Sequence, residues 1–197
     1  MMPPGLRIGL QEWSVCVQAL ERGRSCVLIR KGGIHEPRGG LFTPEHERFA
    51  LLPSYLHQAA ERLHPEYGGE FLAQSVRTAQ PGVIPVTIWA AVARVWKCTE
   101  LARVQALGAE LPWSAAEIAT RFAYRQQPFL FVLALRVQRL PTLLALPDRP
   151  SYGGCRSWIS LEDPVPTEGA TPVISDADWS ARLAHLDGLL GVRTPGP

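Results

Sequence analysis

The sequence predicts an α+β fold: a mostly antiparallel sheet, for which a barrel-like form is one option, with short helices and a C-terminal helix. Apolar runs of strand length recur along the chain, and short helical patterns fall between them. The regular alternation of strand and helix that marks a parallel sheet is missing. Apolar residues make up 46% of the 197 residues, enough for a real core.

The N-terminal part begins with an ambiguous segment. Residues 10–20 fit either an alternating strand or one face of a helix, and we favour the helix. Ser25–Arg30 is predicted to be a strand because its apolar residues are continuous. A loop rich in glycine and proline is expected over residues 32–44.

A second short strand is expected over Arg48–Leu52. Pro53 is expected to end this strand, since proline cannot donate a ladder hydrogen bond. Ser54 is then placed to cap a helix that runs to about Leu63.

The middle of the chain predicts two long strands with two helices between them. Val83–Trp96 is apolar on both alternating faces, which indicates a strand buried on both sides or strongly curved. Thr99–Leu107 has the pattern of a short helix. Ser114 opens a clearer one, because Glu117 stands where a capping box needs it. Phe129–Leu140 is the strongest strand pattern in the chain.

The C-terminal part predicts a crossing over Leu140–Pro150, a last strand over Arg156–Leu161 and a proline-rich linker over Asp163–Pro172. A terminal amphipathic helix follows, capped by Ser175 or Asp176. Its apolar face consists of Trp179, Leu183, Leu186 and Leu190. We therefore divide the chain into a main α+β domain, residues 1–163, and a linker with a C-terminal helix, residues 164–197.

Composition bounds the compartment and the partners. A net charge of +2 argues against a protein that coats nucleic acid through bulk charge alone, although a local basic patch is compatible with it. No signal-peptide core and no membrane-length apolar run is found. Four scattered cysteines without a C-x-x-C pair indicate reduced thiols. They are Cys16, Cys26, Cys98 and Cys155. The prediction is a cytoplasmic protein with no membrane partner.

The first candidate site is Arg30-Lys31-Gly32-Gly33. Backbone N–H groups of a Gly-Gly turn can approach an anion, and two cations stand beside them. A tight turn with a solvated basic end explains the same residues and is the more frequent outcome. The Walker spacing of a phosphate-binding loop is absent.

Histidines and carboxylates form a second candidate group. Glu45, His46 and His57 lie near predicted strand ends, where they would suit metal binding or proton transfer. Their spacing matches no H-E-x-x-H motif, and Glu45 and His46 in an extended segment point to opposite faces. We therefore assign no metal and no cofactor.

Two further groups of residues are candidates. Cys155 beside Arg156 would suit a nucleophilic thiolate, although a packed cysteine is the ordinary outcome. Aromatic and arginine side chains together can stack bases and bind phosphates, although aromatics at strand positions are more often core. This last set comprises Trp89, Trp96, Trp113, Tyr124, Arg94, Arg121, Arg136 and Arg139.

Several sequence pieces resemble one family. They are E-W-x-V from Glu12, V-L-I-R-K-G-G-I from Val27, E-H-x-R-F-x-L-x-P-x-Y-x-H-Q from Glu45, L-R-V-x-R-L from Leu135 and Y-x-G-C-x-S-W from Tyr152. Together they resemble an uncharacterised bacterial family, domain of unknown function 1802, over about residues 11–161. The resemblance implies kinship without a reaction. It also shows which polar residues belong to the shared pattern: Glu12, Arg30, Lys31, His46, Arg48, Tyr55, His57, Gln58, Arg136, Cys155 and Trp158.

Three functional hypotheses follow. The first is a binding module for nucleic acid or a phosphorylated small ligand. The second is a hydrolase, such as a nuclease, that uses Glu12, Glu45, His46 or His57. The third is a structural or assembly protein. The candidate ligand-binding residues are Arg30, Lys31, His46, Arg48, Tyr55, His57, Gln58 and Arg136. We expect Arg30 or Lys31 to lie near His57 or Gln58 on one concave surface.

Overall fold

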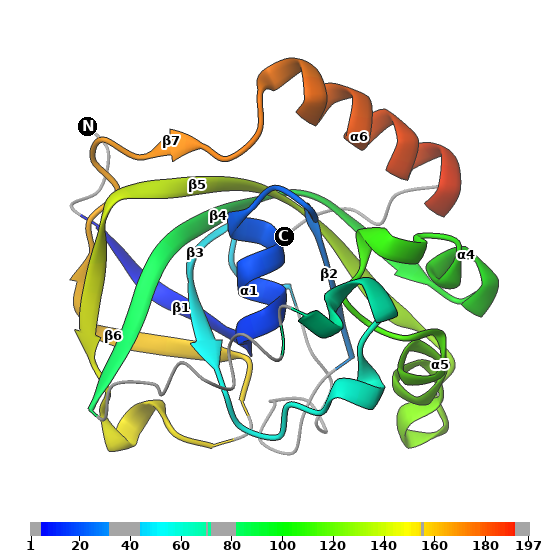
Figure 1. The fold of residues 1–197 in the computed structure, drawn as a ribbon, viewed down its shortest axis with the longest axis horizontal. Coiled ribbons are helices and arrows are strands. Elements are labelled where there is room, and N and C mark those ends of the chain that lie inside the picture. The colour runs from blue at the N-terminus through cyan, green and yellow to red at the C-terminus, as the bar shows by residue number, and fades with distance from the viewer. Residues whose placement is uncertain (1–4, 32–43, 70, 72–81, 155, 192–197) are drawn as a thin grey trace.

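A curved sheet wrapped around one helix forms the centre of the molecule (Figure 1). The computed structural model describes residues 5–31, 44–69, 71, 82–154 and 156–191. Within them seven strands pair in the order β2-β5-β4-β3-β1-β6, and β7 pairs with β5. The strands are β1 (Leu6–Trp13), β2 (Val27–Arg30), β3 (Arg48–Ser54), β4 (Val83–Cys98), β5 (Leu130–Pro147), β6 (Trp158–Val165) and β7 (Thr171–Pro172).

The predicted α+β class with a mostly antiparallel sheet is confirmed. β1 and β3 run parallel, and the other described pairings are antiparallel. The register of β4 on β5 shifts between Val86 and Ile88 and again between Val92 and Arg94. Such bulges bend a strand and increase its twist, so these two long strands curl the sheet. The sheet is nevertheless not closed into a barrel: within the described residues β2 and β6 remain its two free ends.

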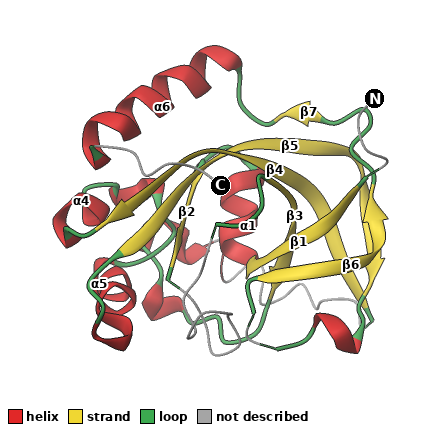
Figure 2. Cartoon of the chain, turned by 180° about the vertical axis from the view of Figure 1, so that it is seen from behind, coloured by secondary structure: helices red, strands yellow, loops and turns green. Residues whose placement is uncertain are grey.

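Four α-helices accompany the sheet in the described part of the chain: α1 (Ser14–Glu21), α4 (Leu101–Gln105), α5 (Ala115–Ala123) and α6 (Asp176–Leu190). α1 lies inside the curve of the sheet and buries Val15, Cys16, Ala19 and Leu20. α4, α5 and α6 gather at one end of the sheet (Figure 2). No helix in the described ranges has the length and apolar content needed to cross a membrane.

The ambiguous segment 10–20 contains both predicted structures in succession. The chain is strand up to Trp13 and helix from Ser14. The prediction of a helix from Ser54 to about Leu63 is wrong. β3 continues through Pro53, and only a 3₁₀ turn, Ala60–Arg62, follows. Pro53 is tolerated because β3 pairs with β4 only up to Ala50, which leaves the N–H side of Pro53 without a ladder.

Three proline-containing segments are more ordered than predicted. β5 runs on through Pro141, which lies opposite the register shift between Val86 and Ile88, where no ladder bond is required. β6 includes Pro164, which a strand at the end of the sheet accommodates. The predicted linker after it contains β7, which pairs with Gln138 and Arg139 of β5.

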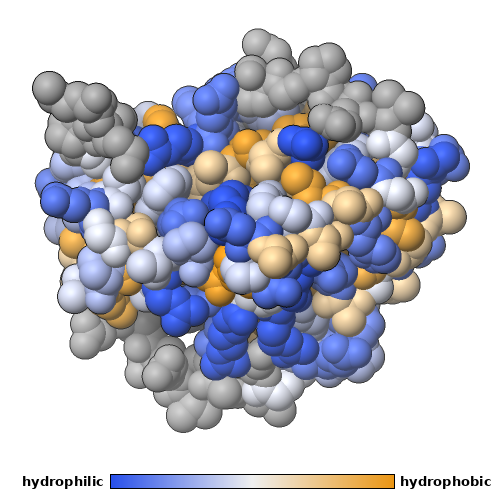
Figure 3. Space-filling model, turned by 90° about the horizontal axis from the view of Figure 1, so that it is seen from above, coloured by the Kyte–Doolittle hydropathy of each residue, from blue (hydrophilic) through white to orange (hydrophobic). Residues whose placement is uncertain are grey.

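The C-terminal helix packs as its pattern predicts. Ser175 caps it by accepting a hydrogen bond from the backbone N–H of Asp178. Leu186 and Leu190 are buried, and Trp179 and Leu183 pack against the main core. The face that carries this helix is largely hydrophilic, with small apolar patches (Figure 3). The division of the chain at residue 163 stays a prediction.

The three described cysteines, Cys16, Cys26 and Cys98, are free and buried, which confirms the burial predicted for the first two. Cys155 lies outside the described residues. Burial raises the pKa of the thiols of Cys26 and Cys98 from 9.0 to about 11 each, and raises that of Cys16 well above its usual range.

Alkaline pH is therefore expected to weaken the fold. Between 9.0 and about 11 the unfolded thiols release protons that the folded ones retain, so stability is present below 9.0 and falls as pH rises through this window. Urea unfolding midpoints across this window would measure the loss. A Cys26→Ala/Cys98→Ala variant should show a shallower fall than the unmodified protein. Equal slopes would contradict the assignment.

Candidate functional site

The open side of the sheet is bridged by a buried ion pair. Arg30, at the end of β2, donates from Nη1 to Oε2 of Glu12 on β1 at 2.9 Å and from Nη2 to the carbonyl of Gln11 at 3.1 Å. These strands share no ladder, since β2 lies at one end of the sheet and β1 is next to the last strand at the other. We call this gap between β2 and the β1–β6 pair the seam. The side chains of Arg30 and Glu12 are only 10% and 3% exposed, so the pair is part of the interior.

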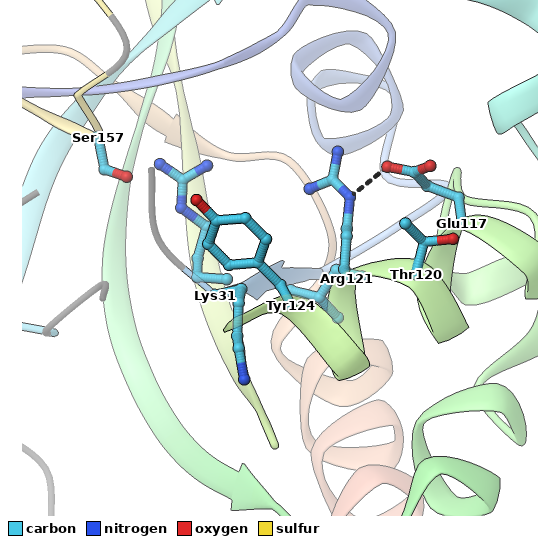
Figure 4. Close-up of a pocket in the computed structure, with 8 residues that line it drawn as sticks. Lys31, Glu117, Thr120, Arg121, Tyr124 and Ser157 are labelled. Carbon is cyan, nitrogen blue, oxygen red and sulfur yellow. Dashed lines mark hydrogen bonds and ion pairs between the residues drawn. The ribbon is translucent and has the colours of Figure 1, made fainter. Parts of the chain in front are cut away.

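A pocket of about 290 Å³ opens beside the seam (Figure 4). One wall comes from the end of β2, one from α5 and its C-terminal turn, and one from the residue before β6. The lining residues are Ile29, Arg30, Lys31, Glu117, Thr120, Arg121, Tyr124 and Ser157. Three cations and one carboxylate line this pocket, with the Glu12 carboxylate behind Arg30.

Arg121 is the pocket cation with the most freedom to bind a ligand. Its Nε donates to Oε1 of Glu117 at 2.8 Å, and its Cζ lies 3.6 Å from the ring centroid of the buried Trp113. Within the described residues no acceptor contacts its two terminal nitrogens. The helix itself is fixed by Ser114, which accepts from the N–H of Glu117 and confirms the predicted cap. Glu117 and Trp113 thus orient the guanidinium, and its two terminal nitrogens remain available as hydrogen-bond donors.

Lys31 has a different role from the one its sequence position suggests. Its ammonium donates to the carbonyls of Phe122 at 3.4 Å and of Phe129 at 2.8 Å, and also to that of Gln127. Figure 4 shows its side chain running away from Arg121. Burial, with a smaller contribution from the charge of Lys97, lowers the pKa of Lys31. Lys31 therefore ties the end of α5 and the start of β5 to β2.

The other predicted site residues lie elsewhere, so the pocket contains two of the eight, Arg30 and Lys31. Gln58 accepts from Ser14 Oγ at 3.1 Å and from the N–H of Val15 at 3.3 Å, which places it at the start of α1. His57 is exposed in a turn with φ of 59°. Tyr55, in the same turn, is 37% exposed. The pocket lining includes neither His57 nor Gln58, so the expected shared surface is not seen there.

His46 and Arg48 face opposite sides of the sheet. The ring of His46 meets that of Trp158 edge-on at 4.9 Å, on the side of Phe49. Arg48 lies over the ring of Trp89 at 4.7 Å. Arg48 and Phe49 are successive residues of β3 and point to opposite faces of the sheet. His46 lies before the strand, on the Phe49 face, so Arg48 and His46 do not face a common ligand.

Arg136 holds the C-terminal helix. Its guanidinium donates to the carbonyl of Ile174 at 2.9 Å and pairs with the carboxylate of Asp176. Among the described residues no group of three His, Cys, Asp or Glu side chains could hold a metal ion. The predicted Gly32-Gly33 turn lies outside the described residues.

Six pocket residues were absent from the predicted ligand-binding set: Ile29, Glu117, Thr120, Arg121, Tyr124 and Ser157. A usable signal existed for three of them, Glu117, Arg121 and Tyr124. Glu117 and Arg121 are spaced i, i+4 on a helix that the capping box had already predicted, so they share one face. Arg121 and Tyr124 also belong to the aromatic and arginine set that the sequence offers for nucleic-acid binding. Which members of that set line the pocket, and that Ser157 joins them, depends on the tertiary fold.

Comparison with known proteins gives one family and a set of solved structures. The family model described as "Domain of unknown function (DUF1802)" matches residues 9–185. No curated protein matches. Crystal structures of ASCH from Zymomonas mobilis are similar. A tyrosine-to-phenylalanine mutant gives a TM-score of 0.46 at 10% identity, over 91% of this chain and 96% of that one. The structure of ASCH described without a mutation gives a TM-score of 0.40 at 10% identity, over 96% of this chain and 97% of that one.

Proposed function

We propose, for a chain that belongs to the DUF1802 family, that the pocket beside the seam binds a phosphorylated ligand, and foremost single-stranded nucleic acid. The family match covers most of the chain and its description names no reaction. The proposal therefore rests on the residues of the pocket.

The observation that carries the proposal is the state of Arg121. Glu117 and Trp113 orient its guanidinium, while its terminal nitrogens have no acceptor among the described residues. A planar guanidinium with free paired donors matches a phosphate or a base edge. The three cations of the pocket, Arg30, Lys31 and Arg121, outnumber the two carboxylates at the site, Glu117 and the Glu12 that pairs with Arg30. This local excess of charge needs no large net charge on the whole chain.

Two features favour binding over hydrolysis. Both carboxylates at the site, Glu12 and Glu117, are engaged by arginines at 2.9 and 2.8 Å, whereas a general base must be free to accept a proton. The other residues of the hydrolase hypothesis, Glu45, His46 and His57, do not line the pocket.

Arg121→Ala is expected to weaken binding of a labelled single strand of about 12 nucleotides, within the site sizes of single-strand binders. The loss should be about tenfold, as for a hydrogen bond to a charged group. The log–log salt dependence of the affinity should become shallower by about one unit. Fluorescence anisotropy with RNA and with DNA measures both.

Arg103→Ala is the matched control for this test. Like Arg121, Arg103 pairs with a glutamate about one helical turn before it, Glu100 at 3.0 Å. Arg103 lies on α4, however, and does not line the pocket. Its replacement should leave the affinity unchanged. Thermal unfolding of both variants checks that they are folded. Equal effects of the two substitutions, or no binding of either strand at low salt, would overturn the proposal.

A further inference from the structure

We propose that the pocket takes one unpaired nucleotide, with its base stacked against Tyr124 and Arg121, so that a fully paired duplex is excluded. This inference rests on the proposed function and names the class of ligand that the same site accepts. It is carried by the burial of Arg30, the size of the pocket and the way in which Tyr124 is held.

Burial decides against contact with a duplex surface. Arg30 is 9% exposed and Ser157 is 8% exposed. Proteins that bind duplex phosphates do so with cations that reach outward to the backbone. Here part of the ligand must enter the pocket to meet Arg30. Only a nucleotide that has left its helix, or was never paired, can do so.

The size of the pocket limits how much of the ligand enters. Its volume of about 290 Å³ lies at the lower end of pockets that enclose a small molecule. A single nucleotide is of this class, whereas several residues of a strand are not. The remainder of a strand would stay outside and contact the rim, where Thr120 and Tyr124 are exposed.

Two flat groups are available for stacking. Tyr124 lines the pocket and keeps 36% of its surface exposed. Arg121 has one face of its guanidinium covered by Trp113 at 3.6 Å, which leaves the other face uncovered by that ring. Unpaired bases stack on aromatic rings and on arginine planes.

The backbone around Tyr124 is held in an uncommon conformation. Arg125 and Gln126 have φ of 56° and 57°, a region that non-glycine residues rarely adopt. Such residues persist where the surrounding structure holds them, and they cluster at ligand sites. The Lys31 ammonium supplies that hold, since it binds the carbonyls of Phe122 and Gln127 on either side of this turn. Tyr124 is thus presented at the pocket before any ligand arrives.

The test compares three RNA probes built on one labelled strand of about 12 nucleotides: the strand alone, its blunt duplex, and that duplex with one unpaired nucleotide. The single strand and the duplex with the unpaired nucleotide should bind. The affinity for the blunt duplex should be at least about tenfold lower than that for the single strand, because the blunt duplex has no unpaired base to stack. Equal binding of the blunt and the interrupted duplex would overturn the inference.

Variants of Tyr124 test the stacking directly. Tyr124→Ala should weaken binding of the single strand about tenfold, and Tyr124→Phe should retain it, because stacking requires the ring and not the hydroxyl. Tyr55→Ala is the control, since Tyr55 is 37% exposed and lies outside the pocket lining. An unchanged affinity of Tyr124→Ala would overturn the inference.

The outcomes separate this inference from the proposed function. If Tyr124→Ala and the duplex series show no effect while Arg121→Ala still weakens binding, the pocket binds phosphate without a stacked base. If Arg121→Ala has no effect either, the proposed function fails as well. Competition by free nucleoside monophosphates distinguishes the two sources of the ligand: displacement of the strand indicates a free nucleotide, and retention of the strand indicates a nucleotide within a polymer.

Discussion

Arg30→Met is expected to lower the free energy of unfolding by about 3–5 kcal/mol, because it leaves the Glu12 carboxylate buried without its cation. That carboxylate is 3% exposed and otherwise accepts from the N–H of Trp13. Arg30 also bridges two strands without a common ladder, so its loss removes the connection across the seam. Urea unfolding followed by tryptophan fluorescence measures the change.

Arg149→Met provides the comparison for this buried pair. Arg149 pairs with Glu162 and Asp163 at 3.3 and 2.8 Å, but these groups are on the surface. Solvent screens exposed pairs and leaves them little net effect on stability, so this variant should be nearly as stable as the unmodified protein. Adding Glu12→Gln to Arg30→Met should recover part of the loss, since the uncompensated charge is then gone. Similar stabilities of Arg30→Met and Arg149→Met would contradict the role of the seam ion pair.

Lys31→Met is expected to destabilise the fold by about 2–3 kcal/mol, the magnitude of hydrogen bonds to a charged group and of carbonyls left without a donor. It should also weaken strand binding, because Lys31 holds the turn that presents Tyr124. Urea unfolding of Lys31→Met measures the loss of stability, and fluorescence anisotropy of the same variant measures the loss of strand binding.

Lys97→Met is the matched control for Lys31. Both ammonium groups lie against the ring of Phe129, at 3.7 Å for Lys31 and 4.5 Å for Lys97, but Lys97 is exposed. Its replacement should cost at most about 0.5 kcal/mol, as is usual for surface substitutions. If the two variants unfold at the same denaturant concentration, the carbonyl contacts of Lys31 do not stabilise the protein.

Local patterns predicted the elements whose signals are contained within a few residues. The capping box at Ser114, the cap at Ser175 and the apolar runs of β2, β4 and β5 each depend on neighbours along the chain. Prolines were the main source of error. Pro53, Pro141 and Pro164 all lie in strands, because at each of these positions no neighbouring strand accepts a hydrogen bond from the backbone nitrogen. Which positions are free of that requirement depends on strand pairing, which sequence does not reveal.

The sequence by itself determined the α+β class, the family and the presence of Arg30 and Lys31 at a strand end. Only the tertiary structure decided what these cations do. The curl of the sheet brings β2 opposite β1, so Arg30 meets Glu12, 18 residues away. The packing of α5 brings the carbonyl of Phe122, 91 residues away, to Lys31. Contacts at such separations arise from the packing of whole elements, because no local pattern encodes which strand end will face which helix. The pocket is a property of that packing.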